Sequence, residues 1–296
     1  MLFRSGEDDA TSVVIDGQTF AAEASTIITV DTLTDVTDAT DGLTSLREAL
    51  ASAVSGDLVT FDSSLRGGTI TLGGTELGIT NSLTLDGDLN DDGIPDITID
   101  GNGTSRVFNV NDSNGSVDQD VVLEGLIITG ANASGNGGGI LNRESVTLRN
   151  STLSGNTANR GGAIYNRTAT LIINNSTLSG NSATDVTAGG GAILNNGSTA
   201  SISNSTISGN SGSRGGGFYN YNSTLTLNNS TISGNSAVSG CGGGYSIRAV
   251  GTLSLNNSTF SANSTSSSCS GIYNFVSNAN IITSTITGNS AAKPCG

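Results

Sequence analysis

The chain of 296 residues contains no histidine and no tryptophan, only 2 prolines and 4% aromatic residues. Without histidine, catalytic centres of the Ser-His-Asp and Cys-His types and histidine–zinc sites are excluded. Few large side chains are available for a conventional core, whereas an apolar content of 34% is too high for a disordered chain. The apolar runs are short, so we expect no membrane-spanning segment. Small apolar residues must therefore be buried in a regular pattern.

The charge is distributed unevenly, with a net value of −14. Residues 1–130 hold 23 of the 25 acidic residues and 4 of the 11 basic ones, so the rest of the chain is weakly basic. Its basic residues are scattered, which argues against a nucleic-acid partner.

Two short motifs alternate along the second half of the chain. The first, Asn-Ser-Thr-Leu-Ser-Gly-Asn, begins at Asn150 and returns with variations at 175, 204, 229, 257 and 283, at intervals of 25–29 residues. The second has the form Gly-Gly-Ala-Ile-x-Asn and ends at Asn142, Asn166, Asn195 and Asn220. Each period holds two or three short alternating runs and no helical pattern. A repeat of this length predicts an all-β fold, a parallel β-helix with one repeat per coil.

Strand alternation assigns each repeated position to the inside or the outside of the coil. The apolar position of the first motif should point inward: Leu153, Leu178, Ile207, Ile232, Phe260 and Ile286. One asparagine per coil falls at a corner, where stacked amides can hydrogen-bond along the rod: Asn156, Asn181, Asn210, Asn235, Asn263 and Asn289.

Two outward columns are candidate binding surfaces. In the second motif the residue between the inward Ile and Asn should point outward, in the column Leu141, Tyr165, Leu194, Tyr219 and Tyr273. Tyr245 belongs to it if the preceding glycines do not shift the alignment. Stacked aromatics can bind sugar rings or a partner surface, or pack only on one another. A row of threonines (Thr152, Thr177, Thr206, Thr231, Thr259 and Thr285) is typical of ice-binding faces but also of ordinary strands.

The first part of the chain lacks the regular repeats. Ser45 and Glu48 form a capping-box pattern, and Leu46, Ala49, Leu50 and Ala53 follow at helical spacing, which predicts a short amphipathic helix to about Ser55. Because an open β-helix end exposes its core, we expect an N-terminal cap here. We divide the chain into an arm (1–25), a cap (26–66) and the β-helix (67–296), with irregular coils at 67–120 and regular repeats at 121–296. Strands of the irregular coils are expected at 69–72, 79–85, 96–100, 106–110 and 121–128.

An acidic loop at 88–96 has the spacing of a calcium-binding loop. Asp88, Asn90, Asp92 and Asp96 supply side-chain oxygens, Ile94 a backbone oxygen, and Gly93 permits the sharp turn. The loop resembles the calcium element of dockerins and thrombospondin repeats, but position twelve is Ile99 instead of Glu. We predict a structural calcium ion; the alternative is an acidic turn whose carboxylates bind backbone N–H groups.

The cysteines also follow the repeat. Cys241 and Cys269 are 28 residues apart, as are the repeat starts at 229 and 257, so they should lie on adjacent coils within bonding distance. We predict a disulfide, or else a column of free thiols. Cys295 is left over.

The second motif, as in Gly161-Gly162-Ala163-Ile164 with Asn166, resembles the repeats of polymorphic outer-membrane proteins. Phe260 to Asn263 matches the second repeat of that family, Phe-x-x-Asn, whereas other coils have Leu or Ile for Phe. The segment from Thr44 to Leu50 is similar to the CSLREA motif of predicted bacterial surface proteins, with Thr for the cysteine. Over residues 26–292 the resemblance implies a right-handed, surface-exposed parallel β-helix. Residues 1–9 contain no signal-peptide-like apolar segment, so secretion is inferred from the repeats.

Three functional classes are compatible with these features. The first is a non-catalytic extracellular structural or adhesive rod, whose partner is a host or cell-surface glycan or protein, or a second copy joined end to end into filaments. The second is a carbohydrate-active enzyme of pectate-lyase type, and the third is an ice-binding protein. Glycoside hydrolysis needs paired carboxylates, but the repeats contain only Glu144 and Asp185, on different coils. We therefore favour the first class and assign no catalytic residue.

Overall fold

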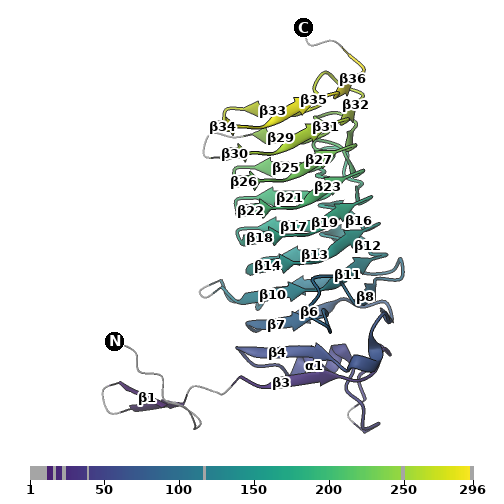
Figure 1. Cartoon of the computed structure of the whole chain (residues 1–296), viewed down its shortest axis with the longest axis vertical. Coiled ribbons are helices and arrows are strands. Elements are labelled where there is room, and N and C mark those ends of the chain that lie inside the picture. Colours follow the sequence, from purple (N-terminus) through teal and green to yellow (C-terminus); the bar gives the residue numbers. More distant parts are fainter. Residues whose placement is uncertain are drawn as a thin grey trace.

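The computed structural model describes residues 12–15, 18–21, 25–38, 40–115, 118–247 and 251–293. Its strands stack coil upon coil into an elongated rod (Figure 1). In the described residues, helix is confined to α1 (Leu46–Ser52) and the 3-10 turn η1 (Ser63–Leu65), and no helix there is suited to crossing a bilayer. The protein is an all-β parallel β-helix, as the repeats predict.

Four parallel sheets form the sides of the rod, so a regular coil has four strands where the sequence indicated two or three. Sheet I contains β3 (Ile27–Val30), β4 (Asp57–Phe61), β7 (Leu83–Asp86), β10 (Asp120–Glu124), β14 (Ser145–Arg149), β18 (Thr170–Asn174), β22 (Thr199–Ser203), β26 (Thr224–Asn228), β30 (Thr252–Asn256) and β34 (Asn278–Ile282). Sheet II contains β5 (Thr69–Thr71), β8 (Ile97–Asp100), β11 (Leu126–Thr129), β15 (Thr152–Ser154), β19 (Thr177–Ser179), β23 (Thr206–Ser208), β27 (Thr231–Ser233), β31 (Thr259–Ser261) and β35 (Thr285–Thr287).

The other two sheets complete each coil. Sheet III contains the short strands β12 (Asn132–Asn136), β16 (Thr157–Arg160), β20 (Ser182–Ala183), β24 (Ser211–Gly212), β28 (Ser236–Ala237), β32 (Ser264–Thr265) and β36 (Ser290–Ala291). Sheet IV contains β6 (Leu77–Ile79), β9 (Phe108–Val110), β13 (Ile140–Asn142), β17 (Ile164–Arg167), β21 (Ile193–Asn196), β25 (Phe218–Tyr221), β29 (Gly244–Ile247) and β33 (Ile272–Phe275). The chain passes through sheets I, II, III and IV in that order in every regular coil.

Left-handed residues make the corner between sheets I and II. Asn150, Asn175, Asn204, Asn229 and Asn257 occupy it with φ of 47–51°, a conformation that asparagine tolerates better than most residues. Gly125 occupies the same corner with φ of 63°. The run at 121–128 is therefore two strands, β10 and β11, because the chain turns at Gly125. The run at 79–85 also divides, into the end of β6 and β7, because the chain turns from sheet IV to sheet I between them.

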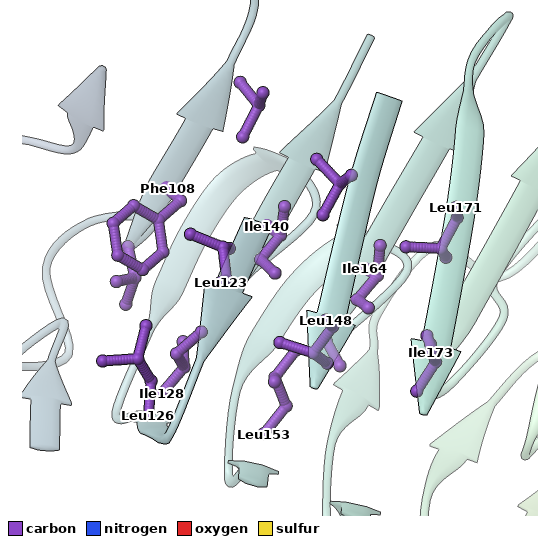
Figure 2. Close-up of a cluster of buried hydrophobic side chains, with 14 of the residues drawn as sticks. Phe108, Leu123, Leu126, Ile128, Ile140, Leu148, Leu153, Ile164, Leu171 and Ile173 are labelled. Atoms are coloured by element: carbon purple, nitrogen blue, oxygen red, sulfur yellow. The ribbon is translucent and has the colours of Figure 1, made fainter. Parts of the chain in front are cut away.

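The core is a continuous column of apolar side chains between the sheets. Figure 2 shows Ile128, Leu148, Leu153 and Ile164 pointing toward one another from different strands. Of the predicted inward residues, Leu153, Leu178, Ile207, Ile232 and Phe260 are fully buried. Ile286 is 47% exposed instead, because β35 is the outermost strand of sheet II and no further coil packs on it among the described residues.

The N-terminal end of the rod is covered by α1. Ser45 caps the helix by accepting the N–H of Glu48, whose side chain accepts the N–H of Ser45 in return. Leu46, Ala49 and Leu50 are buried against the first coils. The helix ends at Ser52, three residues earlier than the expected Ser55, because the carboxylate of Asp57 accepts the N–H of Val54 and holds the chain in a turn toward β4.

The strands β3 and β4 of the predicted cap already belong to sheet I. In the arm, β1 (Ser12–Ile15) and β2 (Gln18–Ala21) pair antiparallel with each other and join none of the four sheets. Cys295 lies outside the described residues.

Candidate functional site

The tyrosine column lies on the outer face of sheet IV. Backbone pairing aligns Leu141, Tyr165, Leu194, Tyr219, Tyr245 and Tyr273 on successive strands. Tyr245 therefore belongs to the column, directly between Tyr219 and Tyr273. The same alternation places Arg167, Asn196, Tyr221 and Phe275 in a second column two residues further along the strands.

Much of this column is buried, although it lies outside the main core. Tyr165 is 3% exposed and Tyr219 is 5% exposed, and they form a separate apolar cluster with Leu141 and Leu194. Ala188, Tyr221 and Tyr245 pack against this cluster. Tyr165 and Tyr219 therefore pack on their neighbours, one of the two alternatives that the sequence left open, whereas Tyr245 and Tyr273 are half-buried.

The aromatic rings from Tyr219 to Phe275 form one continuous aromatic surface, of which Tyr219 is the buried end. The ring centroids of Tyr245 and Tyr273 are 4.8 Å apart in a stacked arrangement, and Phe275 stacks on Tyr273 at 6.1 Å. Tyr219 contacts Tyr221 and Tyr245 edge-on, at 5.9 and 5.6 Å. Such a surface presents apolar ring faces and phenol hydroxyls together.

A four-residue insertion in the 29-residue repeat forms one wall over this surface. After Thr184 and Asp185, which bond to the previous coil, the chain adds Val186 to Gly189 before the glycine corner resumes at Gly190. Asp185 anchors the insertion, since its carboxylate accepts the N–H and hydroxyl of Thr187 and pairs with Arg160 at 2.5 Å. The hydroxyl of Thr187, followed by its N–H and by Arg160, holds the pKa of Asp185 well below its usual range.

The insertion, the second column and Arg160 enclose a cavity of about 280 Å³. Its lining residues are Arg160, Ala188, Leu194, Asn196, Tyr219 and Tyr221. The amide of Asn196 donates to the hydroxyl of Tyr165 at 3.0 Å. Arg214 links the insertion to the aromatic surface. Its Nε donates to the carbonyl of Thr187, and its guanidinium lies 5.6 Å from the ring centre of Tyr245. An apolar aromatic wall and a few polar groups therefore converge on one pocket.

Sequence reasoning missed Tyr221, Asn196, Arg160 and Arg214 as site residues. Two signals could have found them: the strict alternation that places Tyr221 on the same face as Tyr219, and the additional length of the one repeat that carries the insertion.

The predicted asparagine ladder lies at the corner between sheets II and III. Asn156, Asn181, Asn210, Asn235 and Asn263 are buried, and Asn289 is half-buried on the outer coil. From Asn156 to Asn263, the Nδ2 of each donates to the side-chain oxygen of the next and to a strand carbonyl of the previous coil, and the Nδ2 of Asn289 donates to the carbonyl of Phe260. Asn142, Asn166, Asn195 and Asn220 form a second such ladder along sheet IV.

A serine ladder lies at the other end of sheet II, at the corner between sheets I and II, and the sequence analysis did not identify it. The hydroxyls of Ser151, Ser176, Ser205, Ser230 and Ser258 each accept the backbone N–H of the equivalent residue on the previous coil. These ladders satisfy buried corner groups and account for the monotony of the sequence.

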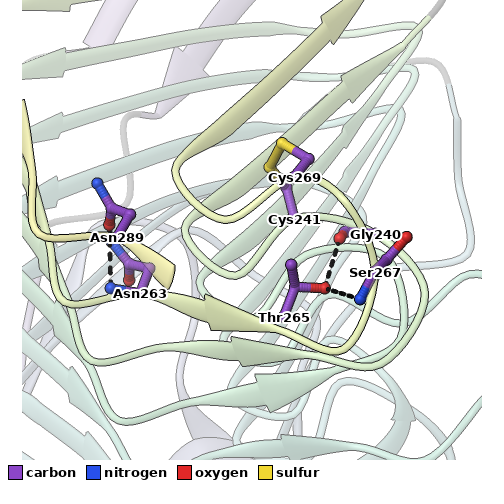
Figure 3. The surroundings of a disulfide bond; sticks show 7 residues. All are labelled: Gly240, Cys241, Asn263, Thr265, Ser267, Cys269 and Asn289. Carbon is purple, nitrogen blue, oxygen red and sulfur yellow. Dashed lines mark hydrogen bonds between the residues drawn. A yellow bond between two sulfur atoms is a disulfide. The ribbon is translucent and has the colours of Figure 1, made fainter. Parts of the chain in front are cut away.

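Cys241 and Cys269 are joined by a disulfide, with their Cα atoms 4.8 Å apart on adjacent coils. Figure 3 shows the bond beside Thr265, whose hydroxyl donates to the carbonyl of Gly240. Each cysteine precedes a tyrosine of the aromatic surface by four residues, Tyr245 and Tyr273 respectively. The disulfide therefore ties together the two coils that carry the stacked rings.

In the acidic loop the carboxylates bind donors of the protein itself. Asp88 accepts the N–H groups of Asp92 and Gly93, and Asp92 accepts the N–H of Ile94 and the amide of Asn90. Asp96 accepts the N–H of Leu89 and pairs with Arg66 at 2.8 Å. In the described part of the chain, no three acidic or cysteine side chains converge on a point where a metal could sit. The carboxylates are thus bonded to backbone N–H groups, to Asn90 and to Arg66, and the calcium ion stays a prediction.

Arg66 is the competitor of any cation at this loop, because it lies 2.8 Å from Asp96 and 3.6 Å from Asp92. If the loop takes up calcium, we expect Arg66→Gln to bind it up to about fivefold more tightly, since an exposed ion pair contributes about 0.2–1 kcal/mol. Calorimetric titration with calcium measures the affinity, and Arg167→Gln is the charge-matched control. Absence of heat in both proteins at millimolar calcium would contradict the calcium interpretation.

Asp112 and Glu144 are the neighbouring carboxylates that a glycosidase-type activity would require. They lie where the chain passes from sheet IV to sheet I. Glu144 is buried, and its two oxygens accept the N–H groups of Asp112 and Gln119. Burial raises the pKa of Glu144, whereas the N–H of Asn114 lowers that of Asp112. Glu144 thus closes the loop between Asp112 and Gln119.

The predicted threonine row lies in register on the outer face of sheet II, from Thr152 to Thr285. These side chains are half-buried except on the outer coil. The ice-binding alternative stays a prediction.

No protein-family model matches the chain, and no curated protein matches its sequence. Among solved structures, the chain is similar to pectate lyase Pel9A, with 16% identity and a TM-score of 0.56 over 92% of this chain and 82% of that one. A match to the A-module of mannuronan C-5 epimerase AlgE6 from Azotobacter vinelandii has 15% identity and a TM-score of 0.30 over 93% and 92%. The first likeness shows the fold, a parallel β-helix. The resemblance to outer-membrane repeats and to the CSLREA segment is not matched by any family model.

Proposed function

We propose that the protein is a non-catalytic extracellular rod that binds carbohydrate on the outer face of sheet IV. The observation that carries this proposal is the cavity between the insertion and the aromatic surface, where Tyr219 and Tyr221 lie beside Asn196 and Arg160. Aromatic rings pack on the C–H faces of sugars, while amide and guanidinium groups bind their hydroxyls. The Cys241–Cys269 disulfide is consistent with an oxidising, extracellular location.

A lyase-type or glycosidase-type activity is the second candidate. The fold likeness to a pectate lyase favours it, but fold alone does not define chemistry. Glu144 is buried with both oxygens hydrogen-bonded, so it does not present a free carboxylate to a glycosidic bond. End-to-end assembly into filaments stays a separate hypothesis; α1 covers the N-terminal core that a neighbouring rod would have to contact.

The proposal is tested by Tyr221→Ala, which removes a half-buried ring of the cavity without changing either asparagine ladder. We expect the wild-type protein to be retarded in gels containing one or more polysaccharides, and the variant to bind about tenfold more weakly. Affinity electrophoresis over a panel of polysaccharides measures both.

Thr226→Ala, on the outer face of sheet I, is the matched control and should bind as the wild type does. Equal binding by Tyr221→Ala would place the site elsewhere and contradict the proposal, as would absence of binding to every polysaccharide by the wild-type protein.

A further inference from the structure

Arginines recur at one corner of the rod beside the tyrosine surface. Arg160 and Arg214 each directly precede the glycine corner of their coil, at Gly161 and Gly215. Gly190 of the intervening coil pairs with Gly215, and its carbonyl accepts the N–H of Gly162. Arg160 and Arg214 are therefore two coils apart in the same column. With about 4.8 Å per coil, their backbones are about 10 Å apart along the rod.

These arginines keep unused hydrogen-bond donors. Within the described residues, Arg160 uses only Nε, which pairs with Asp185, so its two terminal nitrogens have no partner. Arg214 uses Nε for Thr187 and has one long contact, at 3.5 Å, to the hydroxyl of Tyr245. Arg167, on the strand before Asn196, is exposed, and its side chain makes no hydrogen bond or ion pair with the described residues.

Charge on this face is not balanced by acids. Glu144 and Asp185 are the acidic residues of the chain after position 130, and of these Asp185 alone reaches the arginines of the face. The two corner arginines thus have one aspartate between them, and it pairs with Arg160. A guanidinium with free terminal nitrogens binds a carboxylate or sulfate through two parallel hydrogen bonds. A neutral sugar hydroxyl has a single oxygen and no charge, so it cannot make this pair of bonds.

We propose that the ligand of this face is a linear anionic polysaccharide that lies along the rod axis. Its sugar rings contact Tyr221, Tyr245 and Tyr273, and its anionic groups, about one disaccharide apart, bind Arg160 and Arg214. The axial direction follows because both the tyrosine column and the arginine column run along the stacked coils. This inference rests on the proposed carbohydrate-binding function and specifies the class of glycan.

The test compares polymers that share a backbone but differ in charge. Polygalacturonate is paired with its fully methyl-esterified form, and dextran sulfate with dextran. We expect the full-length protein to bind an anionic member at least tenfold more tightly than its neutral partner. Arg160→Gln/Arg214→Gln should lose at least tenfold in affinity for the anionic polymer, and Arg149→Gln, on the outer face of sheet I, should not.

Thermal unfolding of each variant shows whether the fold is retained, and Arg214→Gln alone, which leaves the Arg160–Asp185 pair intact, is the second variant. Preference for polygalacturonate assigns the anionic group as a carboxylate, and preference for dextran sulfate assigns it as a sulfate; either result supports the inference. Binding of neutral and anionic polymers with equal affinity, or full affinity in both arginine variants, would overturn the inference while leaving carbohydrate binding intact. Absence of binding to any polymer would overturn the proposed function itself.

Discussion

Asn181→Leu is expected to lower the free energy of unfolding by about 3–5 kcal/mol. Asn181 is fully buried in the middle of the first asparagine ladder. Its Nδ2 donates to the carbonyl of Leu153 and to Asn210, and its Oδ1 accepts the backbone N–H and the Nδ2 of Asn156. Leucine fills a similar volume but leaves these groups buried without partners, at about 1–3 kcal/mol each.

Urea unfolding followed by far-ultraviolet circular dichroism measures this effect, since the chain has no tryptophan. Ser179→Ala, two residues earlier on the half-buried outer face of sheet II, is the matched control and should change stability by no more than about 0.5 kcal/mol. A loss below about 1 kcal/mol in Asn181→Leu would show that the ladder does not satisfy the corner as described.

Gly244→Ile is expected to destabilise the protein by about 3 kcal/mol, and Phe218→Ile in the same chain to restore most of the loss. Four other coils have isoleucine at this inward position of sheet IV: Ile140, Ile164, Ile193 and Ile272. The preceding coil has Phe218 at this position, and a Cβ added to Gly244 would lie only 2.1 Å from the Cζ of its ring. The glycine therefore provides the space for the phenylalanine of the previous coil, and any larger side chain overpacks the core.

Phe218→Ile alone should cost about 1–2 kcal/mol, since it leaves a cavity beside Gly244 and removes the edge-on contact with Phe260, whose ring centroid is 6.2 Å away. The double variant recreates the stack of isoleucines found in the other coils. The four proteins form a double-mutant cycle, measured by the same urea unfolding. Additive losses, with the double variant the least stable, would refute the proposed compensation.

The repeat made the fold predictable because each residue's main neighbour is its own copy one period away. Asn156 and Asn181, or Leu153 and Leu178, are 25 residues apart in the chain and directly stacked in space. Counting residues between motifs therefore predicts strand register, the inward column and the closeness of Cys241 and Cys269. The capping box at Ser45 and Glu48 was predictable for a different reason, since all its contacts are local.

The candidate site was less predictable because it depends on where the repeat is broken. The path of Val186–Gly189 follows from the bonds of Asp185 to Thr187 and Arg160, which join different coils. In the same way, Arg66 reaches the acidic loop from 26 residues before Asp92, outside any local motif.

The amino-acid sequence by itself determined the β-helix, its register and the residues that face the core. The reason is that equivalent residues of successive repeats stack on one another, so the repeat length sets which residues are neighbours. Only the tertiary structure decided that Tyr165 and Tyr219 are buried while Tyr245 and Tyr273 remain accessible, and that Arg160 and Arg214 flank them. Alternation along a strand predicts which side of the sheet a residue faces. Its solvent exposure depends on the loops and neighbouring side chains that pack over that side.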